Sequence, residues 1–125
     1  MRLALVLAGG ALGSGARYLV AVWMANRFGS TFPWGTLTVN VAGGFVIGLL
    51  ATMADEVGSI GPQTRVFLVV GVLGGFTTFS SFTMETLRLA DQSELWRAGA
   101  YVAASFVLAI AATALGIGAG RSIAR

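Results

Sequence analysis

The chain has 125 residues, of which 56% are hydrophobic and 10% are charged, and its mean hydropathy is +0.83. This composition excludes an ordinary water-soluble domain and is typical of an integral membrane protein, whose surface faces lipid. Cysteine and histidine are both absent, which excludes thiol chemistry, thiolate metal sites and proton transfer by histidine.

The net charge of +3 comes from eight basic residues, all of them arginine, and five acidic residues. The arginines are scattered through the ends of the apolar stretches, so we expect them to anchor the chain in lipid headgroups and to form no surface for nucleic acid. No ATP-binding motif, metal triad or catalytic nucleophile occurs in the sequence, and we therefore predict that the protein is not an enzyme.

Four apolar stretches, at residues 3–25, 35–54, 64–88 and 95–119, each reach the length of about 20 residues that a membrane-spanning helix needs. The connections FGSTFPW, DEVGSIGPQ and ADQSE hold both prolines and four of the five acidic residues, as turns at the membrane surface should. We predict a single all-α domain over residues 1–125, with four transmembrane helices in the inner or plasma membrane of the cell.

Each predicted span carries two glycines four residues apart. This spacing places both glycines on one helix face, where the missing side chains let a second helix approach closely. We therefore expect the four helices to pack against one another at these pairs: Gly9 and Gly13, Gly44 and Gly48, Gly71 and Gly75, Gly116 and Gly120.

Polar residues inside the spans are informative because an unpaired polar group in hydrocarbon is costly. Arg17 is the only arginine well inside a span, and we expect it to snorkel or to bind a carboxylate or a helix C-terminus. In the second span, Thr36 and Asn40 lie four residues apart on one helix face. Asn40 could hold two helices together, or its NH2 group could donate to a passing anion.

The third span contains GGFTTFSSF at residues 74–82. Gly74 and Gly75 weaken a helix, and the hydroxyl groups that follow offer the backbone alternative partners, so we predict a break in this helix near the middle of the membrane. Carbonyl groups freed by such a break could hold a cation, because a discontinuous helix in a membrane commonly marks an ion site.

Phe79 and Phe82 are three residues apart, so both rings project from one face if the helix resumes after the break. The edge of an aromatic ring carries partial positive charge. Ring edges, hydroxyl groups and an amide NH2 in series would form a weak path for a small anion. Glu85, near the end of this span, is either an interfacial charge or part of the ion entrance.

The arginine count gives almost no preference for one orientation in the membrane. Four arginines lie on the side of the termini and three on the other side, namely Arg2, Arg65, Arg121 and Arg125 against Arg27, Arg88 and Arg97. A chain with so little bias could insert both ways, and two opposed copies could pair around a twofold axis in the membrane plane. We expect an antiparallel, dual-topology homodimer; the alternative is a single, weakly biased orientation.

Three stretches together resemble the CrcB/Fluc fluoride channel family: GGALGSGARY (9–18), WGTLTVNVAGGFVIG (34–48) and GGFTTFSSFTMET (74–86). They have the order and spacing of that family, and the resemblance covers almost the whole chain. It implies a dual-topology antiparallel homodimer that exports fluoride ion passively through two pores, with a structural sodium ion (Na+) at its centre. This chain reads SSF where many relatives read STF, which keeps the hydroxyl group.

The resemblance also implies roles for particular residues. Asn40 would face a pore, the ring edges of Phe79 and Phe82 would contact fluoride, and the hydroxyl track would include Ser81 and Thr83. Backbone carbonyls of Gly74 and Thr77 from both subunits would bind sodium. The fourth-span contributors, by a looser match in YVAASF, would be Tyr101 and Ser105.

Two other functions fit a small four-helix membrane protein. A small dual-topology, proton-coupled exporter of the multidrug type would need an ionisable carboxylate in the middle of its first span, where this chain has only Arg17. A helical subunit that only supports an assembly would not need Asn40, a broken third span and the Phe79 and Phe82 face together. The sequence therefore favours the channel.

Overall fold

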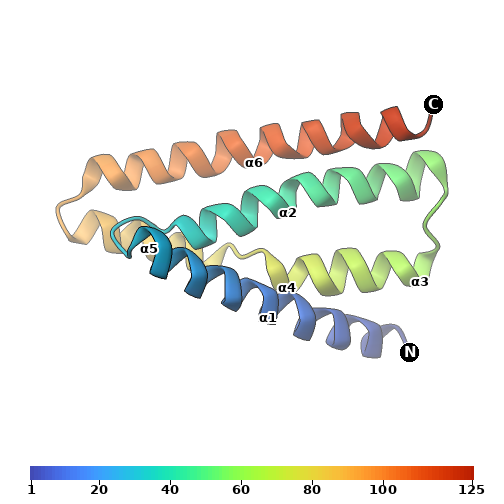
Figure 1. Ribbon diagram of the computed structural model, residues 1–125, viewed down its shortest axis with the longest axis horizontal. Coiled ribbons are helices and arrows are strands. Elements are labelled where there is room, and N and C mark those ends of the chain that lie inside the picture. The colour runs from blue at the N-terminus through green and yellow to red at the C-terminus, as the bar shows by residue number, and fades with distance from the viewer.

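The computed structural model describes residues 1 to 125, and its helices run roughly along one axis (Figure 1). Both termini lie at one end of the molecule, and the α1–α2 and α5–α6 connections lie at the other. The elements in chain order are α1 (Arg2–Phe28), α2 (Trp34–Thr52), the π-helical η1 (Met53–Val57), α3 (Pro62–Arg65), the π-helical η2 (Val66–Leu73), α4 (Gly74–Phe76), α5 (Ser80–Asp91) and α6 (Leu95–Ile123).

Four apolar helical stretches are long enough to cross a membrane: Arg2–Phe28, Trp34–Val57, Pro62–Asp91 and Leu95–Ile123. Each contains one of the predicted spans. The first three extend it by one to three residues at each end, and the fourth extends it by four residues at its C-terminal end only. The prediction of an all-helical chain with four long apolar helices is therefore confirmed. The first two stretches are each followed by a glycine with a positive φ angle, Gly29 (80°) and Gly58 (70°). Glycine adopts this backbone conformation without steric cost, and it is common at the residue where a helix ends.

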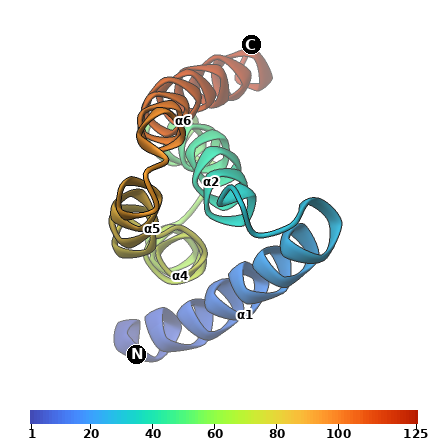
Figure 2. The same cartoon turned by 90° about the vertical axis from the view of Figure 1, so that its left-hand side faces the viewer.

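The predicted glycine pairs lie where the helices are in closest contact. A Cβ atom on Gly9 would lie 2.6 Å from the carbonyl oxygen of Phe67, and a Cβ atom on Gly13 would overlap the carbonyl oxygen of Val72. Glycines of α2 and α6 meet the backbone of the opposite helix in the same way. Figure 2, a view along the helices, shows α2 beside α6 and α1 running past α4. The prediction of close helix packing through glycine is confirmed.

Two glycines of α6 provide a matched test of this packing. A Cβ on Gly116 would overlap the carbonyl oxygen of Phe45 in α2, whereas a Cβ on Gly118 has nothing within 4 Å. We expect Gly116→Ala to lower the free energy of unfolding by about 1–3 kcal/mol, because neither backbone can move aside. Gly118→Ala should leave it unchanged or slightly raised. Thermal unfolding in detergent measures both, and equal melting temperatures for the two variants would contradict this account.

The helical backbone of the third span is interrupted after α4. Thr77 is extended, with φ −89° and ψ 160°, and regular helix begins again at Ser80. Gly74 and Gly75, which we expected to weaken the helix, are themselves helical. Gly75 is needed for packing, since a Cβ there would lie 2.6 Å from the carbonyl oxygen of Gly10 in α1.

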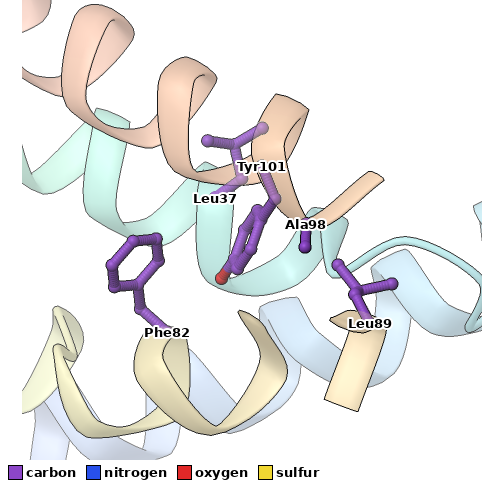
Figure 3. Close-up of a cluster of buried hydrophobic side chains, with 5 residues drawn as sticks. All are labelled: Leu37, Phe82, Leu89, Ala98 and Tyr101. Atoms are coloured by element: carbon purple, nitrogen blue, oxygen red, sulfur yellow. The ribbon is translucent and has the colours of Figure 1, made fainter. Parts of the chain in front are cut away.

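A cluster of buried side chains joins α5, the helix that follows this interruption, to α2 and α6 (Figure 3). Its members are Leu37, Phe82, Leu89, Ala98 and Tyr101. Tyr101 is completely buried and lies between Phe82 and Leu89 in Figure 3. The cluster therefore fixes the resumed helix α5 against the other two helices.

Candidate functional site

Asn40 of α2 holds the interrupted segment through two hydrogen bonds. Its Nδ2 donates to the carbonyl oxygen of Thr78 at 2.8 Å, and the backbone N–H of Thr78 donates to its Oδ1, also at 2.8 Å. Asn40 therefore links two helices, which was one of the two roles expected for it. An amide NH2 group has two N–H donors, and only one of them has a partner in the chain.

Hydroxyl groups satisfy the backbone on both sides of the interruption. The Thr77 hydroxyl donates to the carbonyl oxygen of Leu73 at 2.9 Å, and the Thr77 backbone N–H donates to the same oxygen at 3.0 Å. The backbone N–H of Ser81 donates to the Thr78 hydroxyl at 3.2 Å, as at the start of many helices. These bonds are the alternative partners that the run of threonine and serine predicts.

Carbonyl oxygens in this segment divide into two groups. The oxygen of Gly75 accepts a hydrogen bond from Arg17 Nε at 3.0 Å, so Arg17 binds the C-terminal end of α4, one of the roles expected for it. The oxygens of Gly74 and Thr77 accept no hydrogen bond from any group in the chain. These two carbonyl groups are therefore free to bind another ligand.

A cavity of about 450 Å³, here called the central cavity, lies beside the interruption. Six of the predicted site residues line it, namely Asn40, Gly74, Thr77, Phe79, Phe82 and Ser105, together with Thr78, Phe106, Ala109 and Ile110. Residues from α2, from both halves of the third span and from α6 thus meet at one place, although they are far apart in the sequence.

Two phenylalanine rings in the central cavity differ in their surroundings. Phe79 is 69% exposed and Phe82 is 7% exposed, and their ring centroids are 5.6 Å apart. Phe82 also contacts the rings of Tyr101 and Phe106, at centroid distances of 5.2 and 5.9 Å. Phe82 is thus held in position by its neighbours, whereas Phe79 projects from the surface of the single chain.

Ser105 of α6 places an unsatisfied hydroxyl group on the central cavity. Its Oγ is buried and has no hydrogen-bond partner in the chain, which is rare because an unpaired buried hydroxyl is costly. A hydroxyl group can donate one hydrogen bond to a species in the cavity. Ser105 is therefore a second donor beside the free N–H of Asn40.

Glu85 lies one turn of α5 beyond Phe82. It accepts hydrogen bonds from the hydroxyl of Thr36 at 2.7 Å and from that of Tyr101 at 3.3 Å. Thr36 and Glu85 also line a second cavity of about 400 Å³, here called the mouth cavity, at the end where α1 and α2 are connected. The Glu85 carboxylate is thus fixed between the central cavity and the mouth cavity.

The model of the family described as "CrcB-like protein, Camphor Resistance (CrcB)" matches residues 4–117. The chain belongs to the CrcB-like family. Three curated relatives of this CrcB-like protein are each named "Fluoride-specific ion channel FluC". The Agrobacterium fabrum protein is 46% identical over 123 residues, which cover 98% of both chains. The Rhodospirillum centenum protein is 50% identical over 105 residues (84% of this chain, 83% of its own), and the Rhizobium meliloti protein is 47% identical over 119 residues (95% of both).

Four predicted residues of this chain do not line the central cavity. Two of them, Glu85 and Tyr101, are hydrogen-bonded to each other, and the other two are Thr83 and Ser81. The Thr83 hydroxyl donates to the carbonyl oxygen of Ser80 at 2.9 Å on the exposed side of α5. Ser81 is half-buried and contributes its backbone N–H to the start of α5. Their place in a hydroxyl track stays a prediction.

The sequence did not single out one residue that the CrcB-like fold brings to the site, and for a second, Thr36, it indicated the helix face shared with Asn40 but not the partner. Phe106 lines the central cavity against Phe82, and its only signal in the sequence is its position directly after Ser105. Thr36 binds Glu85, a pairing between residues 49 positions apart that no local pattern reveals.

Proposed function

We propose that this protein is a fluoride-selective ion channel that lets fluoride leave the cytoplasm passively, in a multi-pass arrangement in the cell membrane. One observation carries the proposal: all ten residues around the central cavity are uncharged, yet they include two unused hydrogen-bond donors, those of Asn40 and Ser105. The curated relatives named as fluoride channels support the same function.

The chemistry of the central cavity suits a small anion in transit. A conducting site must bind the ion well enough to replace some of its water and weakly enough to release it. An amide N–H, a hydroxyl group and the edges of phenyl rings are weak donors of this kind. A fixed arginine in the same place would hold fluoride too strongly, and Arg17 instead binds a backbone carbonyl.

A passive channel is sufficient for export. Neutral HF enters cells from acid surroundings and ionises in the less acidic cytoplasm, where the anion is trapped. A membrane potential that is negative inside drives a single negative charge outwards by about 2.3 kcal/mol per 100 mV. Fluoride therefore leaves without ATP or a coupled proton.

The residues of the first span do not favour the alternative function, a small proton-coupled exporter of the multidrug type. The only charged residues in α1 are Arg2, Arg17 and Arg27. A proton-coupled exporter of the small multidrug type needs a carboxylate there to exchange protons with its substrate. A purely structural subunit would have no use for unsatisfied donors on a cavity, because each costs free energy.

The proposed channel is an antiparallel, dual-topology homodimer, with the interruption of the third helix in the middle of the membrane. Phe79 is exposed in the single chain and the central cavity opens beside it, so a second copy would complete the wall. Tags at the C-terminus should be labelled in comparable amounts from both sides of the cell membrane. Labelling from one side only would contradict dual topology.

A sodium ion fits the two free carbonyl groups of the interruption. The oxygens of Gly74 and Thr77 have no partner in the chain, and hard oxygen ligands suit a small alkali cation. In the dimer each subunit would supply this pair, and the ion would hold the two interrupted helices together. Sodium should then raise the melting temperature of the dimer, as any ligand of the folded state does, and potassium should not. Equal melting temperatures in both salts would contradict the site.

Fluoride efflux from liposomes that contain only the purified protein tests the proposed function. We expect fluoride to leave rapidly when a permeant cation pathway balances the charge, and chloride to stay inside under the same conditions. Protein-free liposomes provide the background. Equal release of both anions would contradict selectivity, and release of neither from liposomes with folded protein would contradict the channel.

A further inference from the structure

The arginines of this chain differ in what they bind. Three of them pair with carboxylates: Arg65 with Asp55, Arg97 with Glu94, and Arg121 with Glu56. Arg17 donates to a backbone carbonyl. Arg88 lines the mouth cavity, is exposed, and forms no ion pair.

Arg88 lies on the face of α5 that also carries the proposed fluoride path. Phe82, Glu85 and Arg88 follow each other at intervals of three residues, so their side chains emerge on neighbouring turns. With a rise of 1.5 Å per residue, Arg88 is about 9 Å beyond Phe82 and about 4.5 Å beyond Glu85 along the helix axis. Phe82 lines the central cavity, and the other two line the mouth cavity.

Glu85 creates an electrostatic problem for an anion on this route. Its carboxylate lines the mouth cavity, on the turn of α5 between Phe82 and Arg88, and a negative charge there repels fluoride. A positive charge a few ångströms further out offsets this repulsion and raises the local concentration of anions. Because Arg88 is exposed and lines the mouth cavity and not the central cavity, it attracts the ion without trapping it.

We propose that Arg88 is the residue that draws fluoride into the mouth cavity, by compensating the charge of Glu85. This inference rests on the proposed channel function and assigns to the mouth cavity the capture of a small anion. Arg88 acts through its charge at a distance, so lysine should replace it and a neutral side chain should not.

Arg97 is a matched control for a role in headgroup anchoring. It lies in the first turn of α6, at the same end of the molecule, where it pairs with Glu94 and its guanidinium carbon is 5.2 Å from the centroid of the Trp96 ring. It does not line the mouth cavity. A simple anchoring role would give Arg88 and Arg97 similar importance.

The test compares fluoride flux through the parent protein, Arg88→Gln, Arg88→Lys and Arg97→Gln in neutral-lipid liposomes at two concentrations of potassium isethionate. At about 10 mM salt, where charges act over about 30 Å, we expect Arg88→Gln to lower the flux about three- to tenfold. At about 1 M salt, where the range falls to about 3 Å, its flux should approach that of the parent. Arg88→Lys should match the parent at both concentrations. Arg97→Gln should lose much less flux than Arg88→Gln at low salt, because Arg97 is paired with Glu94 and does not line the mouth cavity.

Three results would overturn the inference. An Arg88→Gln flux equal to the parent at low salt would show that the charge does not matter. A loss of the same size at both salt concentrations, or one that lysine does not restore, would indicate a packing role. A parent protein that conducts no fluoride at either concentration would instead contradict the proposed function itself.

Discussion

Replacement of Asn40 by aspartate is expected to lower fluoride flux at least about tenfold while the protein still folds. Aspartate keeps the oxygen that accepts the Thr78 N–H, but its second oxygen would face the Thr78 carbonyl oxygen that the Asn40 Nδ2 now contacts at 2.8 Å. Loss of that donor leaves the carbonyl unsatisfied, which costs about 1–3 kcal/mol. The added negative charge also repels an anion in the central cavity.

Thr113→Val provides the control for loss of a polar group inside a span. The Thr113 hydroxyl donates only to the carbonyl oxygen of Ala109 in its own helix, at 2.9 Å, so its removal should leave the flux close to that of the parent. Flux from liposomes and elution volume in gel filtration are measured for both variants and for the parent. A folded Asn40→Asp protein that conducts like the parent would contradict a role for Asn40 in the path.

The close contacts between helices could be predicted from local sequence. A glycine pair at a spacing of four marks a helix face without side chains whatever its partner, so Gly9, Gly13 and Gly116 all lie against a neighbouring backbone. The identity of the partner helix could not be predicted in this way, because the sequence shows which face is bare and not what it meets.

The position of the helix interruption could be predicted only approximately. Gly74 and Gly75 have poor helix propensity, yet both remain helical because Gly75 lets α4 approach α1. The interruption follows at Thr77, next to Thr78, whose backbone is bound by Asn40 from 38 residues away. The interruption thus coincides with a tertiary hydrogen bond, and local propensity does not contain that information.

The direction in which side chains point after the interruption depends on the residue at which the helix begins again, and the sequence alone does not give that residue. Once α5 is known to begin at Ser80, the helical period places Phe82 and Glu85 towards α2 and α6 and Thr83 towards the outside. Before that, Ser81 and Thr83 looked equivalent to the residues that line the cavity. The pairing of Glu85 with Thr36 and Tyr101 likewise joins three helices and has no local signature.

Phe79→Ile is expected to reduce fluoride flux at least about tenfold with little change in stability. Phe79 lines the central cavity and is 69% exposed in the single chain, so isoleucine removes few contacts within the subunit and keeps much of the apolar volume. What it removes is the ring edge, which is the part of the side chain that carries partial positive charge. The loss should therefore fall on conduction and not on folding.

Phe82→Ile is expected to reduce the flux to a similar extent, but for two combined reasons. Phe82 is 7% exposed and packs against Tyr101 and Phe106, so its replacement also costs about 1–3 kcal/mol of stability through altered packing. Its flux must therefore be compared with its melting temperature. The more exposed Phe79 gives the cleaner measurement, because the two effects separate there.

Phe45→Ile is the matched control for both variants. Phe45 lies in α2, is 37% exposed and does not line the central cavity, so its replacement changes the same chemistry at another place. Each variant is purified as folded protein, its melting temperature is recorded, and its fluoride flux is measured with chloride as reference. If the rings serve only in packing, flux should follow melting temperature through all three variants. If ring edges contact the ion, Phe79→Ile should lose its flux at an unchanged melting temperature while Phe45→Ile conducts. A well-folded Phe79→Ile protein that conducts like the parent would disprove that contact.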